Sequence, residues 1–340
     1  MGELVLWIFL LVLGLALLVK GADWFVDGAA GIAEKCRVSP LVIGLTVVAF
    51  GTSAPELATS ITAAVKAYSD PSAVSLSLTN VFGSNIMNIL LILGLSALIR
   101  CLPVKKVSLW LDIPVLLVAS ALIVGLGVWG SALNWWDGLV LLIVFAAYMA
   151  VLFVNAHKEK KREMLAPPQE ESVEKEPKTR LGKWFAAMKQ KTWFLVILTI
   201  VGLGMVVGGG MLLVEGATFI AEDYLHVDPG IVGLTVVAIG TSLPELVTSV
   251  VAAVKKKTDI AVGNVIGSNI FNIMLVAGVA SLVHPLPFEM NRLVDALVAL
   301  GAAVLLYACA LIGRKKIGRI AGAIMLLSFI GYYVYLFVTL

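Results

Sequence analysis

The chain has 340 residues, of which 60% are hydrophobic and only 14% are charged, and its formal net charge is +3. A soluble domain carries about 25% charged residues, so this composition excludes a single water-soluble domain and disfavours a nucleic-acid partner. The three cysteines are widely spaced and form no CxxC motif, so neither a disulfide framework nor a zinc site is indicated.

The hydrophobic residues gather in segments that match membrane-crossing helices of about 20 residues. The first segment has no basic residues before it, so we interpret it as a retained span rather than a cleaved signal peptide. The first and sixth segments are long for one crossing, and we expect them to be tilted. We therefore predict an all-α polytopic membrane protein with ten transmembrane helices, at residues 4–33, 40–65, 74–99, 108–128, 138–156, 193–221, 230–254, 260–283, 293–312 and 318–338.

The basic residues predict the orientation of these segments. Nearly all of the 25 Lys and Arg residues lie in the polar stretch 157–192 or in loops that follow odd-numbered segments, whereas loops after even-numbered segments hold only Lys66 and Arg292. Loops rich in Lys and Arg remain in the cytoplasm. We therefore expect a multi-pass protein of the cell membrane with both termini extracytoplasmic.

Two motifs occur once in each half of the chain. Residues 44–60 read GLTVVAFGTSAPELATS and match GLTVVAIGTSLPELVTS at 233–249, while NVFGSNIMNI at 80–89 matches NVIGSNIFNI at 264–273. Each half holds five segments, and because five is odd the second half enters the bilayer with opposite polarity. Such inverted repeats are typical of secondary transporters, which bind their ions near the membrane midplane. We predict a first five-helix repeat at 1–156, a cytoplasmic linker at 157–192 and a second five-helix repeat at 193–340.

The first motif places acidic and hydroxyl groups at a break in a membrane helix. Pro55 has no backbone N–H, so the carbonyl oxygen of Gly51 is left free near the middle of the span. Glu56 lies four residues after Thr52 and shares its helix face. The candidate ion-binding residues of the two copies are Thr52, Ser53 and Glu56 in the first, and Thr241, Ser242 and Glu245 in the second.

The chemistry of these groups favours hard cations. They offer only oxygen, which suits Ca²⁺ and Na⁺, and neither motif holds His or Cys for Zn²⁺ or Cu⁺. A carboxylate inside the membrane is costly, and intramembrane acids are functional by default. Two glutamates can be balanced by one divalent ion, by monovalent ions or by protons, which provides a physical basis for exchange. The structural alternative is that Glu56 and Glu245 only bond neighbouring helices.

The second motif adds neutral oxygen donors that could complete the ion shells. Within each copy a Ser and an Asn are spaced i, i+4 and therefore line one helix face. Their alternative role is hydrogen bonding between helices, which is common in membranes. These candidates are Ser84, Asn88, Ser268 and Asn272.

Four other asparagines in the second motif have structural interpretations. Asn85 and Asn269 lie one residue off the face of the candidate donors, so we expect packing or backbone bonding for them. Asn80 and Asn264 begin the motif and are interpreted as candidate helix caps.

Outside the motifs, the first and sixth segments carry two further features. The glycines of the sixth segment, Gly202, Gly204 and Gly208–Gly210, predict a smooth surface for close packing or for sliding. Asp27 and Glu215 occupy matching places, which we expect near the ends of their spans. Lys20 and Asp23, spaced i, i+3, are expected to pair.

The two motifs resemble the alpha repeats of the calcium/cation antiporter superfamily, which includes the sodium/calcium exchangers. The resemblance covers segments two and three and segments seven and eight, and the ten-segment plan agrees with it. It implies that Glu56 and Glu245 are the central calcium ligands, helped by the backbone carbonyls of Thr52 and Thr241. The implied sodium ligands are the two glutamates with Thr52, Ser53, Ser84, Thr241, Ser242 and Ser268, and Asn88 and Asn272 fill the remaining central positions.

The resemblance also implies the transport cycle. The protein is expected to be a secondary active antiporter, not an enzyme, that exchanges Na⁺ for Ca²⁺ by alternating access, without a cofactor and as a monomer. Potassium-dependent relatives carry Asp at the place of Asn272, so potassium cotransport is disfavoured. The short linker has no room for the calcium-sensing domains of animal exchangers and indicates a prokaryotic protein.

Three alternatives to sodium/calcium exchange remain. The nearest is an exchanger of H⁺ for Ca²⁺ or for another divalent cation. An intramembrane aspartyl protease would need paired Asp residues, and no repeated Asp occurs in a central span. A passive channel is disfavoured by the inverted repeat with its two carboxylates.

Overall fold

The computed structural model describes residues 2–70, 74–165, 187–225, 238–290 and 293–339. Nearly all of them are helical. The first half of the chain contains α1 (Gly2–Cys36), α2 (Pro40–Ile43), η1 (Gly44–Val48), α3 (Ala49–Thr52), α4 (Ala54–Lys66), α5 (Ser75–Ile86), η3 (Met87–Leu93), α6 (Gly94–Ile99), β1 (Leu102–Pro103), η4 (Ser108–Asp112), α7 (Ile113–Gly130), β2 (Ala132–Leu133) and α8 (Trp135–Leu165), where η marks a π-helical segment. The second half contains α10 (Thr192–Phe219), η5 (Ile220–Tyr224), α12 (Ala238–Thr241), α13 (Leu243–Val254), α14 (Thr258–Ile270), η7 (Phe271–Val276), α15 (Ala277–Val283), β3 (Leu286–Pro287), α16 (Leu293–Ile312), β4 (Lys316–Ile317) and α17 (Arg319–Thr339).

The described helices account for the predicted membrane segments. Eight continuous helices are long and apolar enough to cross a bilayer, and the pair Pro40–Thr52 and Ala54–Lys66, bent by 44°, forms a further broken span. The predicted seventh segment is represented by Leu243–Val254, while residues 226–237 before it lie outside the described part of the chain. Helix α8 continues to Leu165, beyond the predicted end at 156, because the Lys- and Glu-rich residues that follow favour helix. Residues 166–186 of the predicted linker lie outside the described residues.

Two short β-ribbons reveal the relation between the halves. The ribbons join β1 to β4 and β2 to β3, and both are antiparallel. The strands β1 and β3 hold the same Leu-Pro dipeptide, at 102–103 and 286–287, in matching loops of the two halves. Strand β1 of the first half pairs with β4 of the second half, and β3 of the second half pairs with β2 of the first. The same contact therefore forms twice, as expected for two repeats related by a two-fold axis.

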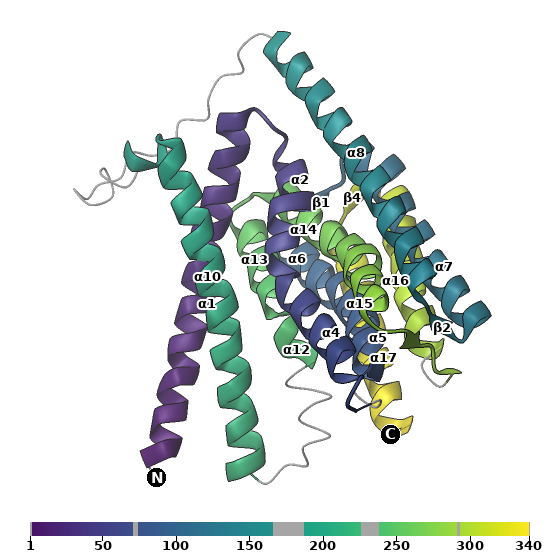
Figure 1. The fold of residues 1–340 in the computed structure, drawn as a ribbon. Coiled ribbons are helices and arrows are strands. Elements are labelled where there is room, and N and C mark those ends of the chain that lie inside the picture. The colour runs from purple at the N-terminus through teal and green to yellow at the C-terminus, as the bar shows by residue number, and fades with distance from the viewer. Residues whose placement is uncertain (1, 71–73, 166–186, 226–237, 291–292, 340) are drawn as a thin grey trace.

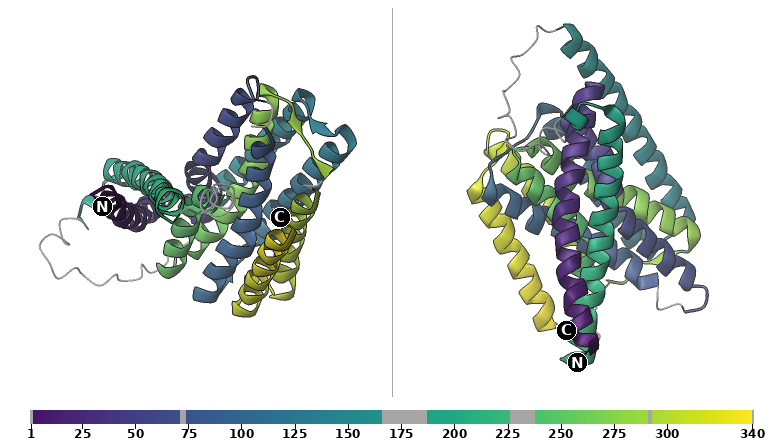
Figure 2. Two further views of the ribbon diagram at one scale, coloured as in Figure 1. Left: turned by 90° about the horizontal axis from the view of Figure 1, so that it is seen from below. Right: turned by 90° about the vertical axis from the view of Figure 1, so that its left-hand side faces the viewer.

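Helices α1 and α10 form a separate layer beside the other helices. They run side by side in both views that show them from the side, and both chain termini lie at the same end of the molecule (Figures 1 and 2). Glycines allow their backbones to approach closely: a Cβ added to Gly202 would lie 2.5 Å from the Phe25 nitrogen, and one added to Gly209 would lie 2.6 Å from the Gly14 oxygen. Close packing is thus confirmed for these two glycines, whereas Gly204 and Gly208 face open space.

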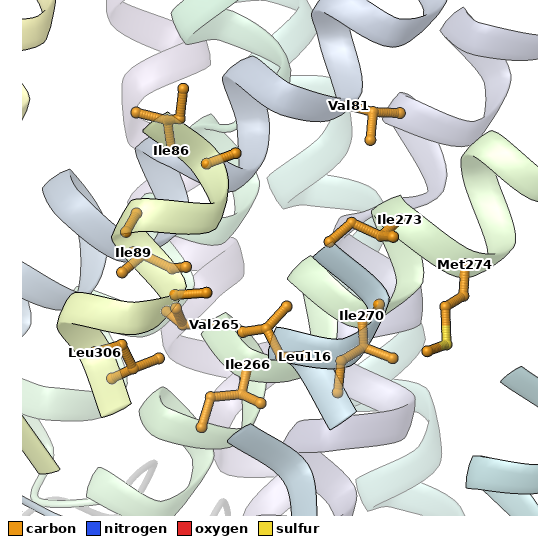
Figure 3. Packing of buried hydrophobic residues seen from close by; sticks show 14 of the residues in the cluster. Val81, Ile86, Ile89, Leu116, Val265, Ile266, Ile270, Ile273, Met274 and Leu306 are labelled. Atoms are coloured by element: carbon orange, nitrogen blue, oxygen red, sulfur yellow. The ribbon is translucent and has the colours of Figure 1, made fainter. Parts of the chain in front are cut away.

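The remaining helices surround a continuous apolar core. Helix α14 lies at its centre, because every residue from Ile260 to Ile270 is buried. Isoleucines of α5, η3, α14 and η7 belong to this one buried cluster, including Ile86, Ile89, Ile270 and Ile273 (Figure 3). This core holds the two repeated motifs in fixed positions, with polar side chains enclosed at their contact.

Candidate functional site

The two broken helices have nearly the same local geometry. Helix α3 ends at Thr52 and α4 begins at Ala54, with Ser53 between them at φ −85° and ψ 4°. In the second repeat Ser242 separates α12 from α13 at φ −90° and ψ 4°. A proline lies in the first turn of each following helix, where its missing N–H costs no intrahelical bond. The predicted break is therefore found at both Pro-Glu sequences.

The helix breaks place both glutamates in the first turn of the helix that follows. Glu56 lies in α4 and Glu245 in α13, near helix N-termini whose dipoles favour negative charge. Their side chains are 1% and 0% exposed. Ser53, in the break that precedes Glu56, donates a hydrogen bond to Glu245, so both acids lie at the same contact between the repeats. Two buried acids at one contact require compensation by a cation or by a proton.

The second motif contributes one π-helical segment from each repeat. Asn88 lies in η3 and Asn272 in η7, one turn after Ser84 and Ser268. A π-helical turn inserts an extra residue into the helix, and such turns occur frequently at functional sites. Segment η3 packs against α13 and η7 against α4, so each asparagine-bearing turn contacts the broken helix of the other repeat.

Hydroxyl groups link the two repeats directly. The Ser53 hydroxyl donates a hydrogen bond of 3.1 Å to Oε1 of Glu245. Thr52 Oγ1 lies 3.4 Å from Ser268 Oγ, and Ser242 Oγ lies 3.4 Å from Ser84 Oγ. All three contacts join a residue of the first repeat to one of the second. The site thus lies at the interface between the repeats.

Several polar side-chain atoms of this cluster have no hydrogen-bond partner in the described protein. They are both carboxylate oxygens of Glu56, Oε2 of Glu245 and the side-chain amide atoms of Asn88 and Asn272. Buried polar atoms in folded proteins are nearly always bonded, and unpaired ones need an explanation. Ligation of a transported cation would satisfy the oxygens.

Every predicted site residue falls at this interface or at the helix breaks that form it. Glu56, Glu245, Ser53, Ser242, Thr52, Ser84, Ser268, Asn88 and Asn272 are buried, and Thr241 at the end of α12 is partly buried. Within the described residues no group of three or more His, Cys, Asp and Glu could hold a metal ion. A cation bound here would therefore rely on two carboxylates and neutral oxygens.

One residue of the cluster was misjudged from the sequence. Asn264 is not a helix cap, because it lies in the middle of α14 and is 0% exposed. Its Oδ1 accepts a hydrogen bond of 3.1 Å from Thr52, and its Nδ2 donates one of 2.9 Å to Ser249. It therefore ties the first broken helix to the second.

The matching asparagine of the first repeat makes a related contact. Asn80 also lies inside its helix, α5, and its Nδ2 donates a bond of 3.3 Å to Ser60. The helix-cap interpretation is thus wrong for both residues. The repeat itself could have indicated these Asn–Ser hydrogen bonds, since in both halves an Asn begins the second motif and its bonded Ser ends the first.

Asn85 and Asn269 bond to the backbone, as predicted. Nδ2 of Asn269 donates to the Val265 oxygen at 2.6 Å, and Nδ2 of Asn85 lies 3.5 Å from the backbone oxygen of Asn269. The second contact joins the repeats beside the carboxylate cluster. These two residues support the helices that carry the site.

The sequence pattern of the family described as "Sodium/calcium exchanger protein" matches residues 6–154 and 194–338. The chain belongs to this family. It is 38% identical over 329 residues to the uncharacterized membrane protein MJ0091 of Methanocaldococcus jannaschii, covering 96% of this chain and 97% of the relative. It is 33% identical over 355 residues to the sodium/calcium exchanger MaX1 of Methanosarcina acetivorans, covering 96% and 97%.

A solved structure extends the similarity to the fold. The sodium-calcium exchanger NCX_Mj, soaked with Na⁺ and Ca²⁺, superposes with a TM-score of 0.79 at 36% identity, covering 97% of this chain and 98% of that one. The predicted family and the all-α fold of ten membrane helices in inverted repeats are thereby confirmed. This exchanger-family member is accordingly a multi-pass membrane transporter.

Proposed function

We propose that this exchanger-family protein carries Na⁺ and Ca²⁺ in opposite directions through one site centred on Glu56 and Glu245. The observation that carries the proposal is the enclosure of two carboxylates with unpartnered oxygens at the contact between inverted repeats. Family membership and the similarity to NCX_Mj support the same ions. No bound cofactor takes part in this proposal, because the ions themselves are the substrates.

The ligands divide according to the charge of each ion. Ca²⁺ takes six to eight oxygens, so we assign it both carboxylates and the backbone carbonyls of Thr52 and Thr241. Na⁺ accepts hydroxyl oxygens as readily as carboxylates. Its ligands in this proposal are the two glutamates with Thr52, Ser53, Ser84, Thr241, Ser242 and Ser268, while Asn88 and Asn272 complete the centre.

Exchange follows from the charge of the site. Two carboxylates are neutralised by one Ca²⁺ or by at least two Na⁺ ions, so Ca²⁺ and Na⁺ compete for the same site. The empty site would carry two uncompensated charges past an apolar layer, and this cost opposes crossing without an ion. Sodium that enters down its gradient then drives calcium out.

Access alternates by movement of the layer formed by α1 and α10 across the other helices. Their close glycine packing makes them a unit, and the core below them is held by the buried α14. We further propose that the protein lies in the cell membrane with both termini outside, as the basic loops indicate, and that it works as a monomer.

Calcium flux from proteoliposomes tests this function. Vesicles loaded with ⁴⁵Ca²⁺ are diluted into buffers that impose a Na⁺, a K⁺ or a pH gradient, one at a time. Efflux driven by Na⁺ alone is expected, and Glu56→Gln vesicles serve as the control for leak. Efflux driven by the pH gradient alone would instead identify an H⁺/Ca²⁺ exchanger, and efflux insensitive to ions on the opposite side would identify a channel.

A further inference from the structure

A group of ion pairs fastens α1 to the end of α13. Nζ of Lys255 binds the carboxylates of both Asp23 and Asp27, the latter at 2.6 Å, and donates to the backbone oxygen of Asp23 at 3.0 Å. The side chains are 22–32% exposed, so water screens them only in part. Lys20 also binds Asp23 at 2.8 Å, as its spacing predicted. We name Asp23, Asp27 and Lys255 the inner latch, because Lys255 belongs to a loop that the basic residues place in the cytoplasm.

The repeat contains a second copy of the main elements of this latch. Lys255 follows Ser249 in VVAAVK, and Lys66 follows Ser60 in the matching stretch ITAAVK. Asp27 matches Glu215. Lys66 and Glu215 therefore form the symmetry-related set, which we name the outer latch. In the structure both side chains are exposed, and no ion pair joins them among the contacts of the described residues.

Helix packing has the same asymmetry as the latches. Helix α1 packs along α13, the half of the seventh span that leads to the inner latch. The symmetry-related contact would join α10 to α4, and within the described chain α10 has no comparable packing there. A shallow, open groove lined by Val251, Val254 and side chains of α1 lies beside the inner latch. Among the described residues, the ion pairs and the close helix packing thus lie at one end of this interface.

We propose that the two latches close alternately and thereby determine which side of the membrane the ion site faces. In this proposal the structure represents the outward-facing state, in which Lys255 holds α1. Movement of α1 and α10 toward the inward-facing state breaks these pairs and brings Glu215 to Lys66. The proposal rests on the alternating access proposed above, and it adds the residues that hold each end state.

The latches differ in strength, which gives the cycle a resting state. The inner latch has two carboxylates on one lysine, whereas the outer latch has Glu215 alone, because Met211 occupies the place of Asp23. Lys189, at the end of the polar stretch, adds a bond of 2.6 Å to Asp27. More ion pairs form in the outward-facing state, so the protein rests in that state when no ion gradient acts on it.

Cross-linking tests the exchange of latches. In full-length protein whose native cysteines are replaced by serine, Lys66→Cys/Glu215→Cys is treated in proteoliposomes with a short bifunctional thiol reagent. Adding Lys255→Gln is expected to speed cross-linking roughly 2–5-fold, the range for loss of partly screened ion pairs. Lys257→Gln is the matched control, since this exposed neighbour forms no ion pair with a described residue. Equal rates in both backgrounds, or no cross-link in either, overturn the proposal.

Swapping the charges of Lys66 and Glu215 distinguishes loss of an ion pair from damage to the fold. Lys66→Glu is expected to slow ion exchange by a similar factor, and Lys66→Glu/Glu215→Lys is expected to restore it. A double variant as slow as the single one contradicts the latch. If the wild type exchanges Na⁺ for Ca²⁺ but neither the cross-link nor the rescue appears, the latch alone is wrong. If cross-linking depends on Lys255 but no Na⁺ gradient drives Ca²⁺, the proposed ions are wrong and the latch stands.

Discussion

The Ser53 hydroxyl donates a hydrogen bond of 3.1 Å to Glu245, which lies 192 positions further along the chain. The break in one repeat thus holds the carboxylate of the other. If the ions bind at this contact, as we propose, a change in either half should alter their binding.

Neutralising either glutamate should abolish exchange while preserving the fold. Removing one carboxylate leaves a bound cation partly uncompensated in a buried site, at a cost of about 3–5 kcal/mol in its binding free energy. We therefore expect Glu56→Gln and Glu245→Gln to lower the Na⁺-driven Ca²⁺ flux roughly 100-fold or more. In ion-free buffer the same variants should melt at a higher temperature than the wild type, because a buried charge and its repulsion are removed. Thermal unfolding with and without Ca²⁺ measures both effects. Normal flux in either variant would show that the ion binds elsewhere.

Removing the Ser53 hydroxyl should weaken ion binding without unfolding the protein. A hydrogen bond to a charged group contributes about 1.5–3 kcal/mol, so Ser53→Ala is expected to raise the Ca²⁺ concentration for half-maximal flux roughly ten-fold. Ser328→Ala is the control, since the Ser328 hydroxyl is exposed and bonds only to Ile324 of its own helix. Equal shifts in the two variants would argue against a role for the Ser53–Glu245 bond.

Asn264 should act through Thr52. In a double-mutant cycle of Thr52→Val and Asn264→Ala, we expect a coupling of about 0.5–3 kcal/mol in the apparent Na⁺ and Ca²⁺ affinities, because the two side chains share a hydrogen bond. Asn80→Ala combined with Thr52→Val is the matched control and should be additive, since Asn80 bonds Ser60 instead. If the effects of Thr52→Val and Asn264→Ala were additive, Asn264 would act only in helix packing.

Two glycines of α10 should respond differently to the same substitution. A methyl group on Gly202 would meet the backbone of α1 at 2.5 Å, whereas one on Gly204 would meet nothing within 4 Å. Overpacking of this kind costs about 1–3 kcal/mol, so Gly202→Ala is expected to lower the melting temperature and slow transport. Gly204→Ala should leave both unchanged or slightly raise stability, because Ala favours helix. Comparable losses from both changes would mean that the glycines serve flexibility rather than contact.

Much of this architecture could be predicted from the sequence because the bilayer makes polar residues conspicuous. Glu56 and Glu245 stand out within long apolar runs, and the proline before each marks a helix break by removing a backbone donor. The repeat then placed the two breaks in one site. The boundary of α8 was less predictable, since a helix can continue past the membrane into polar residues that favour it.

Hydrogen-bond partners were decided by the tertiary structure. Asn264 looked like a helix cap because it begins a motif, but the crossing of α14 with the broken helix puts Thr52 beside it. The π-helical turns that carry Asn88 and Asn272 were not predicted either, since no simple residue pattern marks them.

The sequence by itself determined the membrane segments, their two inverted repeats and the ten candidate ligands, because burial of oxygen-bearing side chains in an apolar span leaves few other roles. It could not determine which side of the site is closed. The lysines at 66 and 255 are equivalent in the repeat, yet Lys255 pairs with α1 while Lys66 forms no ion pair with the described residues of α10. In the proposed cycle the layer of α1 and α10 packs against one end of the core at a time, so the contacts of the folded chain, rather than the repeated sequence, decide which lysine is paired.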